Sequence, residues 1–278
     1  MTDWLSVRRG DVPLILSLPH TGTEIPVEYE NNFISPWLAR CDTDWWVHQL
    51  YDFAASEFDA TIVRTSVSRS VIDVNRDPSG TSLYPGQATT ELCPTTTFDG
   101  DYLYKENCAP NSVDISARRE KYFAPYHFAI ANELSRLRAL YPVVILYDCH
   151  SIRSFVPRLF KGVLPELNIG TNGGRSCAGG LSRRVVDLCA ESGRSHILDG
   201  RFKGGWITRH HAAPSKGVHA MQMEIACRAY LREPIEPVTE RNWPPEFDAT
   251  FAAPLRDVLR RILCACREFA ALASKSRP

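Results

Sequence analysis

The stretch Val143-Val144-Ile145-Leu146-Tyr147-Asp148-Cys149-His150 decides the fold of this 278-residue chain. Its apolar run predicts a buried strand that ends at a histidine. A second, mostly apolar run over residues 12–18 is followed directly by Pro19-His20 and predicts another strand of this kind. If the two strands are parallel, both histidines lie at the same edge of the sheet.

Further strands are predicted on both sides of this stretch. Residues 61–67 and 71–74 are rich in β-branched side chains, and residues 219–225 alternate as a strand does. Helical patterns lie between them, and they cover residues 44–58, 116–140, 181–190 and 251–273. Pro125 is expected to kink or split the second of these helices.

This alternation of apolar strands with helices predicts an α/β fold with its site beyond the carboxyl ends of the strands. Residues 76–111 form a long excursion rich in proline and glycine, and excursions of this length are usually functional or disordered. No clean linker interrupts the chain. We therefore expect one domain over residues 1–278, a three-layer α/β/α structure with a mixed, largely parallel central sheet.

The composition argues against several classes of protein. Hydrophobic residues make up 44% and charged residues 23%, as in average soluble globular proteins. The 32 basic residues balance the 32 acidic residues, so no basic excess points to nucleic acid and no charge asymmetry points to a membrane surface. The longest apolar runs are too short to cross a bilayer.

The N-terminal residues and the cysteines predict a cytoplasmic protein. The chain begins without the basic segment, long apolar stretch and cleavage site of a signal peptide. Its nine cysteines are odd in number, scattered, and without a Cys-x-x-Cys pair. Such a set indicates reduced thiols rather than a disulfide framework.

His20 and His150 are the first candidates for a metal site. Imidazole is the commonest protein ligand of zinc. Each histidine alone is better explained by a hydrogen bond in a loop, but the repeated strand-then-histidine pattern favours a metal. A catalytic zinc site normally takes three protein ligands and leaves a position for water, so a third ligand is expected.

Acidic residues near the two histidines supply candidates for that third ligand. Asp42 and Asp44 precede the predicted helix 44–58, where acidic residues also serve as ordinary helix caps. One of them can cap the helix while the other binds metal. Glu24, four residues after His20, is a further candidate.

Cationic and polar side chains near these segments suit the binding of a carboxylate. Arg69 and Asn75-Arg76 lie on one segment, and a guanidinium holds a carboxylate in a bidentate grip. A surface salt bridge is the common alternative for a lone arginine. Further basic residues lie close to other candidate segments, namely Arg153, Arg201, Lys203 and Arg209.

Gln222 and Glu224 lie on one face of an otherwise apolar predicted strand. A buried carboxylate there needs either a charged partner or a chemical role. The glycine-rich residues 203–206 lack the spacing of a nucleotide-binding loop. The polar cluster Thr208-Arg209-His210-His211 can either line the site or form an exposed loop.

An ordered set of short motifs resembles the N-formylglutamate amidohydrolase family over residues 12–230. Single motifs are weak, but the ordered set is highly specific. The motifs are Ser17-Leu18-Pro19-His20-Thr21-Gly22-Thr23-Glu24-Ile25-Pro26, Asp42-Thr43-Asp44-Trp45, Val71-Ile72-Asp73-Val74-Asn75-Arg76, Leu83-Tyr84-Pro85-Gly86-Gln87, Cys93-Pro94-Thr95-Thr96-Thr97-Phe98-Asp99-Gly100, Asp148-Cys149-His150-Ser151-Ile152-Arg153-Ser154, Gly200-Arg201-Phe202-Lys203-Gly204-Gly205 and Val218-His219-Ala220-Met221-Gln222-Met223-Glu224.

This resemblance implies a phosphorylase/hydrolase-like fold related to zinc carboxypeptidases, and hydrolysis of N-formyl-L-glutamate to L-glutamate and formate in histidine breakdown. It also implies one zinc ion per chain and a small dicarboxylic N-formyl amino acid as substrate. Carried onto this sequence, the metal ligands are His20, Asp44 (or Asp42) and His150. The implied base is Glu224, Arg69 serves the scissile carbonyl, and Asn75 and Arg76 bind a substrate carboxylate.

One position departs from the family pattern, in which a histidine follows Asp-Thr-Asp-Trp. Trp46 stands there, and His48 follows two residues later, so His48 would have to replace that histidine if it were a ligand. Two other functions stay open at this stage. One is a related metal-dependent N-acyl amino acid deacylase or amidase, and the other is a non-catalytic metal-binding or ligand-binding protein.

Overall fold

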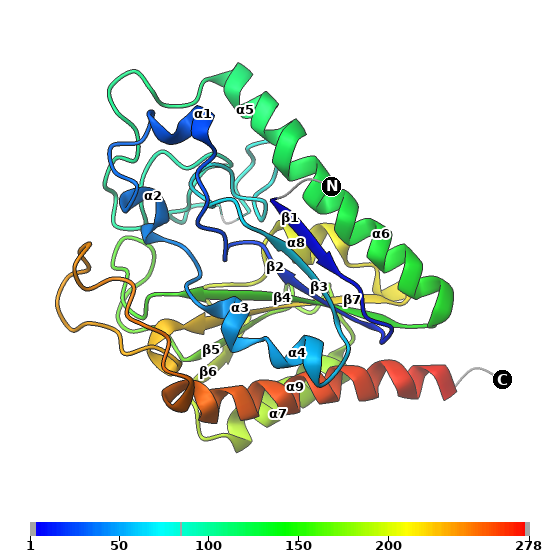
Figure 1. Cartoon of the computed structure of the whole chain (residues 1–278). Helices are drawn as coiled ribbons and strands as arrows, with labels where there is room; N and C mark the ends of the chain where they lie inside the picture. Colours follow the sequence, from blue (N-terminus) through cyan, green and yellow to red (C-terminus); the bar gives the residue numbers. More distant parts are fainter. Residues whose placement is uncertain (1–3, 84, 276–278) are drawn as a thin grey trace.

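A computed structural model describes residues 4–83 and 85–275 of the chain (Figure 1). Tyr84, part of one family-like motif, lies outside the described residues. Seven strands form one sheet in the order β1-β3-β2-β4-β7-β5-β6. In that order, the strands are Leu5–Arg8, Thr61–Thr65, Leu14–Leu18, Val144–Ile152, Val218–Ala226, Leu167–Gly170 and His196–Leu198.

The centre of the sheet is parallel and its margins are not. β2 pairs in parallel with β3 and β4, and β4 pairs in parallel with β7. β1 runs antiparallel to β3, and β5 runs antiparallel to β7 while pairing in parallel with β6. The predicted mixed, largely parallel sheet is therefore confirmed.

Helices cover both faces of the sheet, as Figure 1 shows. Alternate residues of β4 divide between the two apolar cores, because successive side chains of a strand point to opposite faces. The core of one face is closed by α3 (Val47–Leu50), α4 (Phe53–Ser56), α7 (Gly179–Glu191) and α9 (Ala249–Lys275). The core of the other face is closed by α5 (Ser112–Arg118), α6 (Ala124–Leu140) and α8 (Trp206–His211).

Several shorter elements connect these layers. Two four-residue helices, α1 (Val27–Glu30) and α2 (Leu38–Cys41), lie between β2 and α3. Short 3₁₀ turns occupy Pro214–Lys216 and Cys227–Ala229. A π-helical turn at Arg119–Phe123 joins α5 to α6, so the predicted split of this long helix lies just before Pro125. Pro125 itself is in the first turn of α6, where its missing N–H costs little.

The prediction of one continuous helix over residues 44–58 is wrong, because two short helices, α3 and α4, lie there. Trp46 has a left-handed backbone, with φ of 65°, and α3 starts only after it. The Asp44 amide donates to the His20 carbonyl oxygen, which ties this residue to β2 instead of to a helix. A second break separates α3 from α4, where the Gln49 carbonyl accepts a hydrogen bond from Arg256 of α9.

The strand predicted over residues 71–74 is also wrong. This segment is buried but runs as a series of turns. The Val71 amide bonds to the Ser68 carbonyl, and the Asp73 carboxylate accepts from the Asn75 amide, so local bonds replace a ladder. The other predicted strands and helices are present with shifted ends, whereas β1, β5, β6 and α8 were not predicted.

No helix within the described residues is long and apolar enough to cross a membrane. All nine cysteines are free thiols, and seven of them are buried.

Candidate metal-dependent active site

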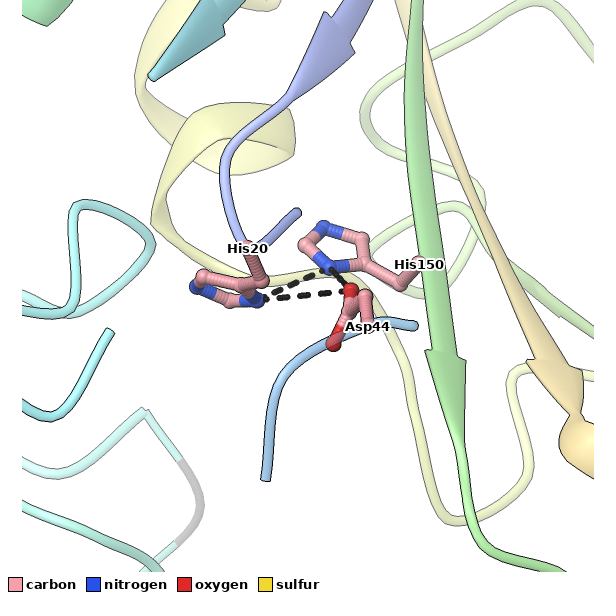
Figure 2. A group of neighbouring side chains, drawn as sticks. All are labelled: His20, Asp44 and His150. Atoms are coloured by element: carbon pink, nitrogen blue, oxygen red, sulfur yellow. Dashed lines mark hydrogen bonds and ion pairs between the residues drawn. The ribbon is translucent and has the colours of Figure 1, made fainter. Parts of the chain in front are cut away.

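Three side chains from separate segments converge at one edge of the sheet (Figure 2). His20 follows β2, Asp44 lies in the turn before α3, and His150 lies within β4. Parallel pairing of β2 with β4 brings the two histidines to the same end of the sheet, where their ring centroids are 4.8 Å apart. All three side chains are almost fully buried, at 1–2% exposure.

The spacing of the three facing atoms fits a metal ion. The two Nδ1 atoms are 3.1 Å apart, and Asp44 Oδ2 is 3.2 Å from His150 Nδ1 and 3.6 Å from His20 Nδ1. A tetrahedral Zn²⁺ with bonds of about 2.0–2.1 Å holds its ligand atoms about 3.3 Å apart. The three atoms therefore lie close to the positions that one face of such a tetrahedron requires.

The other nitrogen of each ring contacts a buried carboxylate. His20 Nε2 lies 2.7 Å from Asp73 Oδ1, and His150 Nε2 lies 2.9 Å from Asp148 Oδ2. A carboxylate can only accept, so each Nε2 donates to its carboxylate and each Nδ1 is the ring nitrogen that faces the cluster. Two imidazole nitrogens and a carboxylate that converge on one point are a donor set suited to a metal ion, and carboxylate–histidine pairs are the usual support of metal ligands.

Asp44 is held in place by neighbours other than the histidines. The Ser151 amide donates to Asp44 Oδ2 over 3.2 Å, and Arg69 Nη1 lies 3.3 Å from Asp44 Oδ1. Burial raises the pKa of Asp44, but the charges and hydrogen bonds of His20 and His150 outweigh burial and lower it. The carboxylate is thus kept ionised, as a metal ligand must be.

The other candidates for a third ligand lie outside this cluster. Asp42 accepts from the Phe98 amide and lies 3.6 Å from Arg153. Glu24 is exposed and accepts from the Ser66 hydroxyl. His48 packs on the ring of Trp46, and burial lowers its pKa to about 4.

Arg69 contacts the cluster through Asp44, and its side chain is almost fully buried, with 6% of the residue exposed. Its Nη2 bonds to Asp73 Oδ2 at 2.7 Å, and its guanidinium lies over the Phe98 ring, 4.9 Å from the centroid. Asp44 contacts Nη1 and Asp73 contacts Nη2, so both terminal nitrogens of the guanidinium are held in place. The guanidinium is therefore a rigid donor in the wall of the pocket that the two histidines also line.

Glu224 lies on β7 directly opposite His150 in the strand register. Gln222 Nε2 donates to its Oε2 over 3.2 Å, while Gln222 Oε1 accepts from the Gly205 amide, so the carboxylate is oriented. Burial raises the pKa of Glu224 to about 7. A carboxyl group with a pKa near neutrality suits proton transfer.

A pocket with about 540 Å³ of space, including its open mouth, begins at these residues. Its walls bring together His20, His150, Glu224, Arg69, Arg76 and Arg201. Arg76 donates to the backbone and hydroxyl of Thr90, and Arg201 donates to the carbonyls of Leu159 and Ala88. The same pocket is therefore lined by the two histidines of the metal-type cluster and by these two guanidinium groups.

Asn75 also lines the pocket, but its amide makes contacts within the protein. Its Oδ1 accepts from the Ile207 amide, and its Nδ2 lies 3.3 Å from Asp148 Oδ2. Gly205 packs on this amide so closely that a Cβ there would lie 2.4 Å from Asn75 Nδ2. Asn75 thus connects the loop that follows Asp73 to α8 through Ile207, and to Asp148, the carboxylate that contacts His150.

Three basic residues proposed from the sequence are not among the described residues that line this pocket. Arg153 is bonded to Asp99 at 2.6 Å on the far side of Phe98. Lys203 is exposed, and Arg209 donates to the carbonyls of Gly204 and Leu83. Asp73 and Asp148 were not singled out from the sequence, although each is a lone carboxylate within a buried apolar run.

Comparison with known proteins decides the family. A family model described as N-formylglutamate amidohydrolase matches residues 12–231, which is most of the chain. The chain belongs to this family.

Curated relatives and solved structures agree with that assignment. The N-formylglutamate deformylase of Pseudomonas aeruginosa is 42% identical over 264 residues, covering 95% of this chain and 96% of the relative. That of Pseudomonas putida is 42% identical over 260 residues, covering 93% and 94%. The crystal structure of N-formylglutamate amidohydrolase from Ralstonia eutropha shares the fold, with a TM-score of 0.73, 21% identity, and coverage of 96% of this chain and 98% of that one.

Members of the N-formylglutamate amidohydrolase family are hydrolases, so the pocket is a candidate active site. The matched residues 12–231 contain all three residues of the metal-type cluster, Glu224 and the arginines around it. The long C-terminal helix α9 lies outside the match and supports the core of one sheet face.

Proposed function

We propose that this enzyme hydrolyses N-formyl-L-glutamate to L-glutamate and formate, with one Zn²⁺ held by His20, Asp44 and His150. The observation that carries the proposal is the convergence of three metal-type donors beside Glu224, at a pocket that Arg76 and Arg201 also line. The names of two relatives at 42% identity supply the substrate.

Zinc bound to these donors would polarise the formyl oxygen and acidify a water molecule. Glu224 is the group that accepts the proton of that water, and it then passes the proton to the leaving amine of glutamate. Its place opposite His150 and its bond from Gln222 keep its carboxylate aimed at the cluster.

Arg69 shares the negative charge that develops on the formyl oxygen. Its guanidinium is already fixed by Asp44 and Asp73, so no reorganisation is needed as that charge appears. Arg76 and Arg201, which line the pocket, bind the carboxylates of the glutamate moiety. Phe98 and Ile152 line the same pocket and are the apolar side chains that would limit the size of the acyl group.

The decisive experiment is a steady-state assay of the zinc-loaded enzyme with N-formylglutamate, N-acetylglutamate and N-acetylaspartate. Our proposal expects N-formylglutamate to have the highest kcat/KM by at least about 100-fold, the discrimination that buried polar contacts and pocket size supply. Preference for an acetylated substrate would make the chain a different deacylase. No turnover of any of the three, together with bound zinc, would leave a non-catalytic metal protein.

The cellular setting is part of the same proposal. We place the enzyme in the reducing cytoplasm, which its nine free cysteines favour. The role in histidine breakdown is the one that the family resemblance implies.

A further inference from the structure

Asp73 makes more contacts to the candidate site than any role as a partner of His20 requires. It is completely buried, and both of its oxygens are used. Oδ1 lies 2.7 Å from His20 Nε2 and accepts from the Asn75 amide at 2.9 Å. Oδ2 lies 2.7 Å from Arg69 Nη2 and 3.6 Å from Arg76 Nη2.

Asp148 provides a matched comparison within the same site. It too is completely buried, and its Oδ2 lies 2.9 Å from Nε2 of the other histidine, His150. The side-chain amide of Asn75 lies 3.3 Å from the same oxygen and 3.0 Å from His150 Nε2, and among the described residues no arginine forms an ion pair with Asp148. Each carboxylate therefore contacts one histidine of the cluster, but of these two carboxylates it is Asp73 that also contacts arginines of the pocket.

We propose that Asp73 is a positioning residue that couples metal binding at His20 to recognition of the substrate carboxylate at Arg76. The proposal rests on the proposed function above. On one side, Asp73 fixes the ring orientation and the protonated nitrogen of His20 so that Nδ1 faces Asp44 and His150, as Figure 2 shows. On the other side, it holds Arg76 at the wall of the pocket without neutralising it completely, because the 3.6 Å pair is long and Arg76 is partly open to solvent.

The coupling follows from the sharing of one carboxylate. A substrate carboxylate that pairs with Arg76 draws this guanidinium away from Asp73 Oδ2, and the carboxylate becomes a stronger acceptor for His20 Nε2–H. A stronger acceptor makes the imidazole a better metal ligand. Because linkage is reciprocal, the bound metal in turn improves binding of the substrate carboxylate.

The first test compares Asp73→Asn with its matched control Asp148→Asn. The zinc dissociation constant of each variant is measured by competition with a chromophoric chelator, and KM and kcat for N-formylglutamate are measured at saturating zinc. Both variants are expected to bind zinc about 10–100-fold more weakly, the usual effect of losing such a partner. KM is expected to rise about tenfold or more in Asp73→Asn and to change less than about twofold in Asp148→Asn. Equal changes of KM in the two variants, or none in either, would overturn the proposal.

The second test keeps Asp73 intact and so does not depend on the folding of the buried Asp73→Asn variant. It compares Arg76→Gln with Arg201→Gln, two arginines that line the same pocket, of which only Arg76 forms an ion pair with Asp73. Removing Arg76 is expected to lower the zinc dissociation constant several-fold in the absence of substrate, whereas removing Arg201 leaves it within about twofold. An unchanged zinc affinity in Arg76→Gln, or the same change in both variants, refutes the coupling.

These measurements separate the coupling from the proposed function. Zinc affinity of the substrate-free protein is read without any turnover. If the wild type binds zinc and shows the expected Arg76 effect but does not hydrolyse N-formylglutamate, the substrate assignment fails and the metal coupling stands. If the wild type hydrolyses N-formylglutamate and Arg76→Gln leaves zinc affinity unchanged, the substrate assignment stands and the metal coupling fails.

Discussion

Two clusters of histidine rings contact one loop, residues 68–76, and they differ in their partners. In the first, His20 and His150 face carboxylates on both ring nitrogens. In the second, His127 of α6 stacks on His211 of α8 with ring centroids 5.2 Å apart. His127 Nε2 bonds to the Val74 carbonyl at 2.8 Å, and its Nδ1 lies 2.9 Å from His211 Nε2.

The electrostatic result is opposite in the two clusters. Burial lowers the pKa of His127 to about 4 and that of His211 to about 3, and the more distant charge of Asp148 raises the pKa of His127 too little to offset desolvation. Burial also lowers the pKa of His150, but Asp148 and Asp44 outweigh it and the pKa is raised well above the usual value. The charge of the neighbours, more than burial, therefore decides which cluster can hold a cation.

The largest expected effect is loss of the metal from one cluster alone. His20→Ala and His150→Ala are each expected to reduce bound zinc to a small fraction of one ion per chain and to remove nearly all activity, since a catalytic site needs three protein ligands. His211→Ala, the matched control from the second cluster, is expected to keep one zinc. Elemental analysis of dialysed protein checks both. A His150→Ala variant with full zinc and activity would remove the distinction between the clusters.

The second-largest effect is expected at Glu224, the carboxylate beside the first cluster. Glu224→Gln is expected to keep the fold and the zinc but to lose roughly 10²–10⁴-fold in kcat, because an amide cannot accept the proton of water. Circular dichroism, zinc content and steady-state kinetics on one preparation provide the measurement. A kcat close to that of the wild type would return Glu224 to a structural role as a buried partner of Gln222.

A smaller effect is expected at the arginines that line the pocket. Arg76→Ala is expected to raise KM for N-formylglutamate about 10–100-fold with little change in kcat, the cost of losing a hydrogen bond to a charged group. Arg69→Ala should instead lower kcat, since its partner charge appears only in the transition state. N-formylglutamine, which lacks the side-chain charge, is expected to be a poor substrate. Its cleavage with the same kcat/KM as N-formylglutamate would indicate a broader deformylase.

The smallest effect concerns stability and the second cluster. The pKa values of His127 and His211 are lower in the folded protein than in the unfolded chain, so the unfolded chain takes up protons first as pH falls. Their contribution to stability is thus complete above about pH 6.5 and is lost as pH falls toward 4. Urea unfolding measures this at pH 7 and pH 4.5. Between these two pH values, the free energy of unfolding should fall by about 1–3 kcal/mol less in a His127→Gln/His211→Gln variant than in the wild type. An equal loss in both proteins would show that these rings are not buried as neutral groups.

The sequence was informative where a site residue directly follows or lies within an apolar strand. The runs before His20 and His150 predicted both strands, and the parallel pairing of β2 with β4 then brings the two histidines together. Glu224 was visible for the same reason, as a carboxylate in the apolar pattern of β7.

The sequence was less informative where long-range contacts decide the direction of a side chain. The sequence offers Asp42 and Asp44 equally as ligands, and the contacts that hold Asp44 at the cluster come from distant residues: its amide donates to the His20 carbonyl, and its carboxylate accepts from the Ser151 amide. Arg201 and Lys203 are two residues apart, yet Arg201 lines the pocket and Lys203 is exposed. Asp73 is hidden because its partners come from segments up to 53 residues away.

The order of strands β2, β4 and β7 has a consequence for how the protein is made. His20 and Glu224 are separated by about 200 residues of chain, so at a synthesis rate of about 5–20 residues per second roughly 10–40 s pass between their appearance at the ribosome. During the first part of that interval, until β4 emerges, β2 has no neighbour on its β4 side, and its apolar residues stay uncovered on that edge. The nascent chain therefore needs protection from aggregation before β4 and β7 emerge, and no amino-terminal fragment that ends before β4 can form the cluster of His20, Asp44 and His150.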